Sequence, residues 1–578
     1  MPAPIPATPS FPAPPMSQTR FGGFRRFSLL TLLLGLVVLL RCWNVGDVFV
    51  SGRIFFVDPD CYSRMTRVRE VVEHPGVVLR HHEFENWPDG TQPHTTAPFD
   101  YLIAALSGGM HLFMESGKSS ERAIDLAGVW ISPLLGMAVA GFLWFWSGRM
   151  RLPYRGAALL LFAASPILVH GTSLGRPDHQ SLVIFCMAVA LGAECLLLGS
   201  ELPAGASKRW GIVAGAAWGM GLWVSLYEPG ILFVVTLAVA LILRPRAVIS
   251  RERWAGWGVF FGILLLAGVI DGWHSPVPEP IVVEYFPNWA RALGELQRVP
   301  LLSSTFARWT LALFPLTPLL LAVTALRGKM GGGCGSRQCA WFWLALLGAT
   351  FALTCWQARW GYFLALVFAM SLPFQLAAFP KRWMALAVFA VSLWPVARDW
   401  EDRLGLSEAG QRELAQRVER RRENLALYDI AQRLRSLAGP QVPGEGLRIA
   451  TLAPWWYSPA LTYWSGQPGV TGSSHQSLPG IVDSARFYLA DDRGGWDAAR
   501  KILARRRVGA VVVYQPERVL ENAFSILGRS GPVPEEGVGA RLYRQPNSPP
   551  EGVKLFAMNP VFRVFLHPEG VEALPSTR

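Results

Sequence analysis

Charged residues are scarce in this sequence. Only 16% of its 578 residues are Asp, Glu, Lys or Arg, while 51% are hydrophobic. An average soluble domain is about 25% charged. The shortage excludes an ordinary soluble enzyme, and the length excludes a single domain. We therefore predict an integral membrane protein.

Cysteine is rare as well, and the chain contains no internal repeat. The seven Cys lie mostly in or beside apolar segments and show no paired spacing in the polar C-terminal region. This pattern gives neither a disulfide framework nor a zinc site. The lack of repeated halves counts against a transporter.

Positive charge is in excess, with 54 Lys and Arg against 41 Asp and Glu, a net charge of +13. In a soluble protein this excess would suggest a nucleic-acid partner. Here much of it lies in short loops between apolar segments, where it sets the orientation in the membrane. We therefore predict a lipid-embedded chain that binds no nucleic acid.

Apolar runs of about 15–23 residues, close to the ~20 that cross a bilayer, recur along the chain. The first extends from Phe27 to Cys42 after two arginines, and no A-x-A-like cleavage site follows it. We therefore predict an uncleaved first span with its N-terminus inside. The other runs centre on 125–147, 154–172, 180–199, 210–226, 230–243, 255–271, 307–326, 340–355, 360–379 and 383–397. The pattern predicts a polytopic α-helical membrane protein with about 11–13 transmembrane helices.

The loops between these runs test the arrangement. With the N-terminus inside, every even-numbered loop should be cytoplasmic and basic. These loops carry Arg149/Arg151/Arg155, Lys208/Arg209, Arg244/Arg246/Arg251/Arg253, Arg327/Lys329/Arg337 and Lys381/Arg382. The agreement requires that residues 99–115 do not cross, so we predict a partly embedded helix there.

An odd number of spans leaves the C-terminal region outside. We predict a disordered cytoplasmic segment at 1–26, a transmembrane domain at 27–397 with external loops 46–124 and 272–306, and an external soluble domain at 398–578. The corresponding location is the inner (plasma) membrane of a bacterium, with the C-terminal domain in the periplasm.

The C-terminal region mixes helical and strand patterns. Apolar positions along 407–438, among many Arg and Glu, predict an amphipathic helix. Its run RVERRREN is expected to be a solvated face. After Pro440, the runs RIATLA and VGAVVVYQ have strand-like composition. We predict a mixed α/β domain.

Charged residues at the mouths of apolar segments mark a candidate site. A charge at the centre of a membrane helix costs about 2.5–3.5 kcal/mol, so charges lie at membrane edges or in wet cavities, usually for function. Asp58 and Asp60 follow the first span in VDPDCYSRMTR and could ligate a divalent metal through hard oxygens. The alternative is an Asp-Pro turn that caps the next helix.

Asp178 lies in LGRPDHQSLVIF, between the third and fourth spans, where helix capping again competes with function. His179 is a candidate metal ligand, although a lone loop His is more often neither ligand nor base. Glu284 lies among apolar residues in PEPIVVEYFPNW, where a carboxylate needs a cation nearby. Arg359, in CWQARWGYF, could bind phosphate or simply snorkel to the interface.

These segments together resemble the catalytic subunit family of oligosaccharyltransferases, including the single-subunit bacterial and archaeal enzymes with the C-type glycosyltransferase fold. Their order, spacing and sidedness agree with the family's pattern. The matching segments are Asp60-Cys61-Tyr62 after the first span, Asp178-His179-Gln180 after the third, IVVEYFPNW with Glu284 in the late external loop, and the external Arg359.

The resemblance implies a role for each matched residue. Asp60, Asp178 and the Gln180 position would hold Mg²⁺ or Mn²⁺, and Asp60 with Glu284 would engage the acceptor nitrogen. Arg359 would neutralise the pyrophosphate of a polyprenyl-linked sugar donor. A metal and an arginine stabilise the charge on such a leaving group without proton transfer.

Two positions depart from the family's pattern. Gln180 stands where the second motif usually has an acid, and a neutral amide is a weaker metal ligand. The family's Trp-Trp-Asp motif, which binds the Ser/Thr of the acceptor sequon, is Trp455-Trp456-Tyr457 here. The two tryptophans could instead belong to the domain core.

We therefore expect transfer of a glycan from a polyprenyl (pyro)phosphate carrier to an external acceptor, with a protein or peptide as partner. One alternative is an enzyme of the same fold that transfers a single sugar from polyprenyl monophosphate. A carrier or exporter of lipid-linked glycans is another, and an inactive assembly protein is a third.

Overall fold

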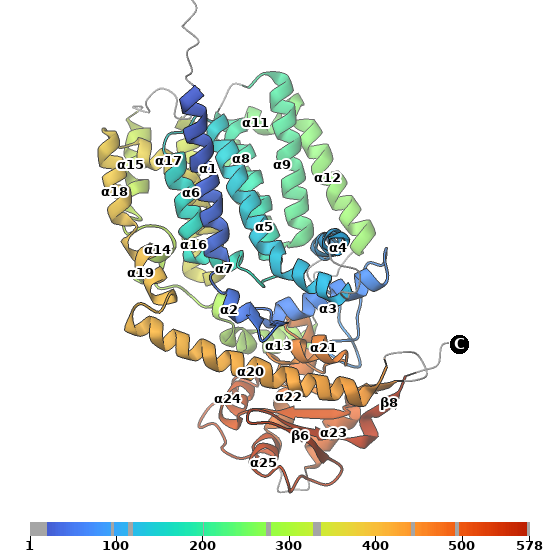
Figure 1. Ribbon diagram of the computed structural model, residues 1–578. Coiled ribbons are helices and arrows are strands. Elements are labelled where there is room, and N and C mark those ends of the chain that lie inside the picture. The colour runs from blue at the N-terminus through green and yellow to red at the C-terminus, as the bar shows by residue number, and fades with distance from the viewer. Residues whose placement is uncertain are drawn as a thin grey trace, which may run out of the picture.

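A bundle of apolar helices stands on a mixed α/β region in the computed structural model (Figure 1). The structure describes residues 20–93, 97–113, 120–199, 202–272, 279–327, 337–440, 446–491 and 496–574. The predicted disordered segment lies outside these residues up to position 19, and the first helix begins at Arg20.

Within the described residues, six helical stretches are long and apolar enough to cross a membrane. They are built on α1 (Arg20–Arg41), α5 (Ser120–Arg149), α8 (Gln180–Gly199), α12 (Arg251–Asp271), α16 (Arg337–Trp356) and α17 (Gly361–Ala377). The protein is thus a polytopic helical membrane protein, as predicted.

The remaining predicted spans coincide with other helices of the bundle. Two are continuous, and three are divided into pairs of short helices, as where Pro166 separates α6 from α7, since proline cannot donate the next backbone hydrogen bond. The continuous helices are α9 (Ala204–Val224) and α10 (Tyr227–Leu243), and the pairs are α6 (Arg155–Ala164) with α7 (Pro166–Gly171), α14 (Thr305–Trp309) with α15 (Leu316–Leu326), and α18 (Arg382–Ser392) with α19 (Trp394–Arg403).

Close glycine contacts fix the pairing of α9 with α12. A methyl group on Gly215 would lie 2.1 Å from the Gly256 carbonyl oxygen, and one on Gly256 would lie 2.2 Å from that of Gly211. Small residues let two helix backbones approach within a membrane, where water provides no driving force for association. Larger side chains at Gly215 or Gly256 would separate the helices.

The two ends of the bundle differ. The start of α1 and the short helix α11 (Pro245–Ile249) lie at one end, while α2 (Val45–Val48), α3 (Pro59–Glu73) and α13 (Pro280–Trp289) lie at the other, beside the α/β region (Figure 1). Helix α4 (Ala97–Leu112) is seen end-on in the same view, so it runs across the direction of the bundle. This orientation suits the partly embedded helix expected at 99–115.

The long helix α20 (Glu408–Ala438) lies between the bundle and the α/β region (Figure 1). Ser407 caps it by accepting a hydrogen bond from the Gly410 N–H at 3.0 Å. Arg417 and Glu423 are buried, and Arg421 Nε lies 2.6 Å from Asp47 Oδ1. The prediction that this charge run is only a solvated face is therefore wrong for Arg417 and Glu423, whereas Glu419, Arg420 and Arg422 are exposed as predicted.

The C-terminal region is mixed α/β, as predicted. Its main sheet has the order β4-β5-β7-β6, with β4 parallel to β5 and the other pairs antiparallel. The strands are β3 (Leu447–Ile449), β4 (Thr451–Leu452), β5 (Ala510–Val513), β6 (Lys554–Met558), β7 (Arg563–Leu566) and β8 (Val571–Ala573), with β3 pairing to β8. The helices are α21 (Ser458–Ser465), α22 (Leu478–Tyr488), α23 (Asp497–Arg505), α24 (Pro516–Ile526) and α25 (Val538–Arg544).

Candidate active site

A small polar cavity of about 30 Å³ lies where the bundle meets the α/β region. Three of the sequence-predicted site residues, Asp60, Asp178 and His179, line it together. The remaining lining residues come from α3, from the segment 82–93 and from the C-terminal loop 473–476: Ser63, Arg64, Arg67, His82, Glu85, Thr91, Gln92, Pro93, Ser473, Ser474 and Gln476. Four segments that are distant in sequence therefore build the site.

Asp58 and Asp60 do different things at the start of α3. Asp58 is the N-cap and accepts a hydrogen bond from the Cys61 N–H at 3.0 Å, so the capping alternative holds for this residue. Asp60, in the first turn, is exposed at the mouth of the cavity, yet the protein around it still desolvates it. This desolvation and the negative charges of Asp58 and Asp178 raise the pKa of Asp60 well above its ordinary value.

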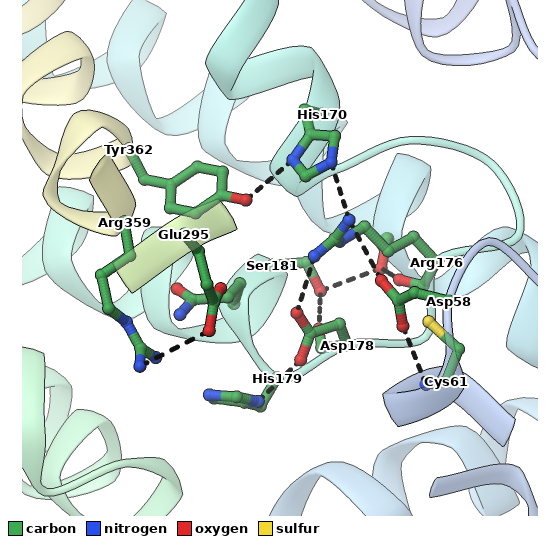
Figure 2. Close-up of polar contacts among 12 residues, drawn as sticks. Asp58, Cys61, His170, Arg176, Asp178, His179, Ser181, Glu295, Arg359 and Tyr362 are labelled. Atoms are coloured by element: carbon green, nitrogen blue, oxygen red, sulfur yellow. Dashed lines mark hydrogen bonds and ion pairs between the residues drawn. The ribbon is translucent and has the colours of Figure 1, made fainter. Parts of the chain in front are cut away.

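Arg176 joins the two acidic motifs (Figure 2). Its Nη1 lies 3.1 Å from Asp58 Oδ2, and its Nη2 lies 3.4 Å from Asp178 Oδ2. His170 Nε2 lies 3.0 Å from Arg176 Nη1 and forms a further hydrogen bond with the guanidinium. His179 Nδ1 lies 2.7 Å from Asp178 Oδ1. Burial disfavours the charge on Asp178, but His179 and Arg176 outweigh it and hold the pKa of Asp178 well below its ordinary value.

The cavity fits a small divalent cation. Its carboxylate oxygens and one imidazole are suitable donors, and a volume of about 30 Å³ accommodates an ion with a water molecule. Desolvation and, after it, the charges of Asp58 and Asp178 raise the pKa of Asp60, and a bound cation would lower it again. Among the described residues, the one group of three such side chains whose donor atoms all lie within 4.8 Å of one another is Glu70, Glu73 and His74 at the far end of α3, and it is mostly exposed. The donor atoms of Asp60, Asp178 and His179 are spaced more widely than this.

Gln180 lies outside this cavity's lining and contacts another carboxylate. Its Nε2 donates a hydrogen bond to Glu228 Oε1 at 3.2 Å. Arg359 Nη2 lies 2.5 Å from the same Oε1, and Arg359 Nη1 lies 3.7 Å from Glu295 Oε1. Figure 2 shows the Arg359 and Glu295 side chains on the opposite side of Asp178 from Asp58.

The sequence analysis missed Glu228 and Glu295. Glu228 stands in SLYEPG, at the beginning of an apolar run, and therefore has the signal that identified the other candidates, a charge at a membrane edge. Glu295 lies in the loop segment after α13, where no pattern distinguishes it from other surface acids.

Glu284 occupies a different environment from the one expected. It is exposed on α13, and the described residues include no hydrogen bond or ion pair to it. The same helix carries Trp289, whose ring packs edge-to-face on Trp455 at 5.7 Å between ring centres. Helix α13 thus contacts the tryptophan motif through Trp289, five positions after Glu284 in the chain.

The three residues of that motif are partly or fully engaged within the C-terminal region. Trp455 Nε1 donates a hydrogen bond to Asn522 Oδ1 at 3.1 Å. The Tyr457 hydroxyl donates to Glu423 Oε2 at 2.9 Å, and Tyr514 donates to Glu423 Oε1 at 2.6 Å. Trp456 packs on both neighbouring rings. The Tyr457 hydroxyl is therefore already occupied by a carboxylate of α20.

The comparisons with known proteins agree with this architecture. No protein-family model matches the chain. Over 165 residues the chain is 27% identical to dolichyl-phosphooligosaccharide-protein glycotransferase 1 of Archaeoglobus fulgidus, a match that spans 28% of this chain and 26% of that relative.

Solved structures match over a larger part of the chain. The archaeal oligosaccharyltransferase of Archaeoglobus fulgidus in complex with an inhibitory peptide and a dolichol-phosphate superposes with a TM-score of 0.61 at 15% identity, over 88% of this chain and 71% of that one. The same enzyme tethered to an acceptor peptide with the NVT sequon gives a TM-score of 0.61 at 15% identity, over 88% and 72%.

The chain therefore shares the polytopic membrane fold of these archaeal oligosaccharyltransferase structures. The resemblance to the oligosaccharyltransferase catalytic subunits is confirmed, at low sequence identity and chiefly through this fold.

Proposed function

We propose that the protein transfers a glycan from a polyprenyl (pyro)phosphate carrier to a protein or peptide acceptor at the external face of a bacterial inner membrane. The observation that carries the proposal is the meeting of Asp60, Asp178 and His179 in one cavity, with Arg359 nearby at the end of α16. The fold shared with a dolichol-phosphate-bound oligosaccharyltransferase supports it.

The donor is bound through its phosphate. Arg359 is held between two carboxylates, and a guanidinium recognises phosphate oxygens through paired N–H donors. Asp60, Asp178 and His179 would hold Mg²⁺ or Mn²⁺, which when bound would neutralise charge on the leaving phosphate. Arg176 bridges the Asp58 and Asp178 carboxylates and fixes their orientation.

The acceptor enters from the side of the C-terminal region. Asp60 accepts a hydrogen bond from the acceptor amide, and Glu284, exposed on α13, is the second carboxylate that the resemblance assigns to the acceptor. Trp455 and Trp456 lie next to α13 and contact the residues that follow the modified one. In this arrangement Gln180 belongs to the donor side, because it contacts Glu228 and not the cavity.

Purified full-length protein, a polyprenyl-pyrophosphate-linked oligosaccharide and an N-x-T peptide test the proposal. Mass spectrometry should show a peptide adduct with the mass of the whole glycan, and Asp178→Asn should abolish it. An adduct of one sugar from a polyprenyl monophosphate donor would favour the alternative enzyme. Glycan movement across proteoliposomes without any adduct would favour an exporter.

A further inference from the structure

Glu228 is a buried carboxylate with no role in the reaction outlined above. It lies in the first turn of α10, and its side chain is 0% exposed. Besides Arg359 and Gln180, it accepts a hydrogen bond from the Ser225 hydroxyl at 2.9 Å. A fully buried carboxylate is tolerated only with such a complete set of donors, so the arrangement around Glu228 is specific.

Arg359 is held by its two acidic partners unequally. Glu228 is 2.5 Å away and fully buried, whereas Glu295 is 3.7 Å away and its side chain is 40% exposed. The Tyr227 ring lies 5.5 Å from the guanidinium carbon and restricts it further. Glu228 is therefore the fixed anchor of Arg359, and Glu295 is the exposed partner that a bound anion can replace.

Gln180 connects this anchor to the acidic loop. It begins α8 directly after Asp178 and His179, and it is 1% exposed. Its amide must direct the nitrogen toward Glu228, since the amide oxygen would repel the carboxylate. The single carboxylate of Glu228 thus contacts both Arg359 on the donor side and the first residue of the helix that directly follows Asp178 and His179.

We infer that Glu228 is a positioning residue, which fixes the Arg359 guanidinium for the donor phosphate and couples it through Gln180 to the loop of Asp178. The inference rests on the proposed function, in which Arg359 binds that phosphate. Glu228 itself touches no substrate.

The first test separates positioning from simple structural support. Glu228→Gln in the full-length protein should raise both the donor KM and the Kd for undecaprenyl phosphate by about tenfold or more, because a charge-assisted contact that orients Arg359 is lost. The acceptor KM should stay within about twofold, since the acceptor side is not altered. Glu228→Asp, which keeps the charge, should recover part of the donor affinity.

Glu194 supplies a matched control. It is also a buried carboxylate in the bundle, ion-paired to Arg253 and hydrogen-bonded by Trp218, but it lies near the opposite end of α8 from Gln180, in a pocket that Val248 of α11 also lines. Glu194→Gln should lower thermal stability without changing the donor KM. Equal changes of donor KM in Glu194→Gln and Glu228→Gln would overturn the positioning role.

A double-mutant cycle gives the second test. If Glu228 acts through Arg359, then Glu228→Gln combined with Arg359→Gln should bind undecaprenyl phosphate as weakly as Arg359→Gln alone, and no more weakly. If the double variant binds undecaprenyl phosphate more weakly than Arg359→Gln by the factor that Glu228→Gln alone shows, the inference is contradicted. Should Glu228→Gln fail to fold, Glu228→Asp and the doubly neutral variant provide the comparison.

The outcomes also separate the inference from the proposed function. If the unaltered protein binds no undecaprenyl phosphate and transfers no glycan, the proposed function fails. If the unaltered protein is active and Glu228→Gln matches its donor KM and Kd, the positioning role alone fails.

Discussion

The Arg176 guanidinium lies 3.1 Å from the Asp58 carboxylate and ties the start of α3 to the loop before α8. These two segments supply Asp60 and Asp178 to the same cavity. Because Arg176 also contacts Asp178, it balances two carboxylates that would otherwise repel each other. The relative position of the two acidic motifs therefore depends on this one side chain.

Arg176→Gln should destabilise the protein by about 3 kcal/mol and abolish transfer, because the buried Asp178 loses a charge partner. Thermal unfolding in detergent and a peptide glycosylation assay measure both effects. Arg308→Gln is the control, since Arg308 forms a half-exposed ion pair with Asp399 at 3.8 Å and its loss should cost under about 1 kcal/mol. Equal destabilisation by both changes would contradict the bridging role.

Removal of divalent cations should stop the reaction. We expect no transfer in excess chelator and recovery with Mg²⁺ or Mn²⁺, because Asp60 and Asp178 face one cavity while its arginines, Arg64 and Arg67, are paired with Asp100. Asp60→Asn should reduce kcat/KM by about 100-fold or more, equivalent to at least ~2.7 kcal/mol of barrier. Full turnover in chelator would show that the acids act without a metal.

The substitution Gln180→Glu tests whether the side chain at position 180 faces the metal or Glu228. If Gln180 faced the metal, the added charge would raise the metal affinity. The structure places it against Glu228, so the new carboxylate should instead repel Glu228 and compete for Arg359. We expect an unchanged metal requirement and a higher donor KM, measured in metal and donor titrations. A higher metal affinity of Gln180→Glu would show instead that the side chain at position 180 is a metal ligand.

The protein should discriminate less between acceptor peptides with and without a sequon hydroxyl than an enzyme with the Trp-Trp-Asp motif does. The motif position that carries an acid in the family is Tyr457, whose hydroxyl is occupied by Glu423. A sequon hydroxyl therefore finds no carboxylate there, and discrimination between N-x-T and N-x-A peptides should be weak. Tyr457→Phe should lower stability by about 1 kcal/mol and leave the peptide preference unchanged. A sharp preference for Ser/Thr in the competition assay would refute this prediction.

Membrane sidedness can be measured with single cysteines and an impermeant thiol reagent. Glu284→Cys, exposed on α13, should react from the outside of intact cells. Lys208→Cys, exposed near the start of α9, should react only after permeabilisation, because its loop belongs to the basic cytoplasmic set. Labelling of Lys208→Cys in intact cells would show that the predicted membrane orientation is wrong.

Much of this protein is determined by one-dimensional patterns. Hydropathy located the bundle helices, since the need to satisfy backbone hydrogen bonds in lipid leaves helices as the form that an apolar run can take. Charges at the edges of these runs located Asp60, Asp178 and Arg359, because a charge is costly anywhere deeper. Strand-like composition located β4 and β5.

Side-chain partners were decided by tertiary structure alone. The sequence places Gln180 beside Asp178, but the contact with Glu228 depends on how α8 and α10 approach each other. The charge run of α20 reads as a solvated face, yet Arg417 and Glu423 within it are buried because α20 lies between the bundle and the α/β region. Local sequence sets which residues are charged and where the helices begin. Which charges meet depends on long-range packing, since ion pairs form between segments that are adjacent only in the folded chain.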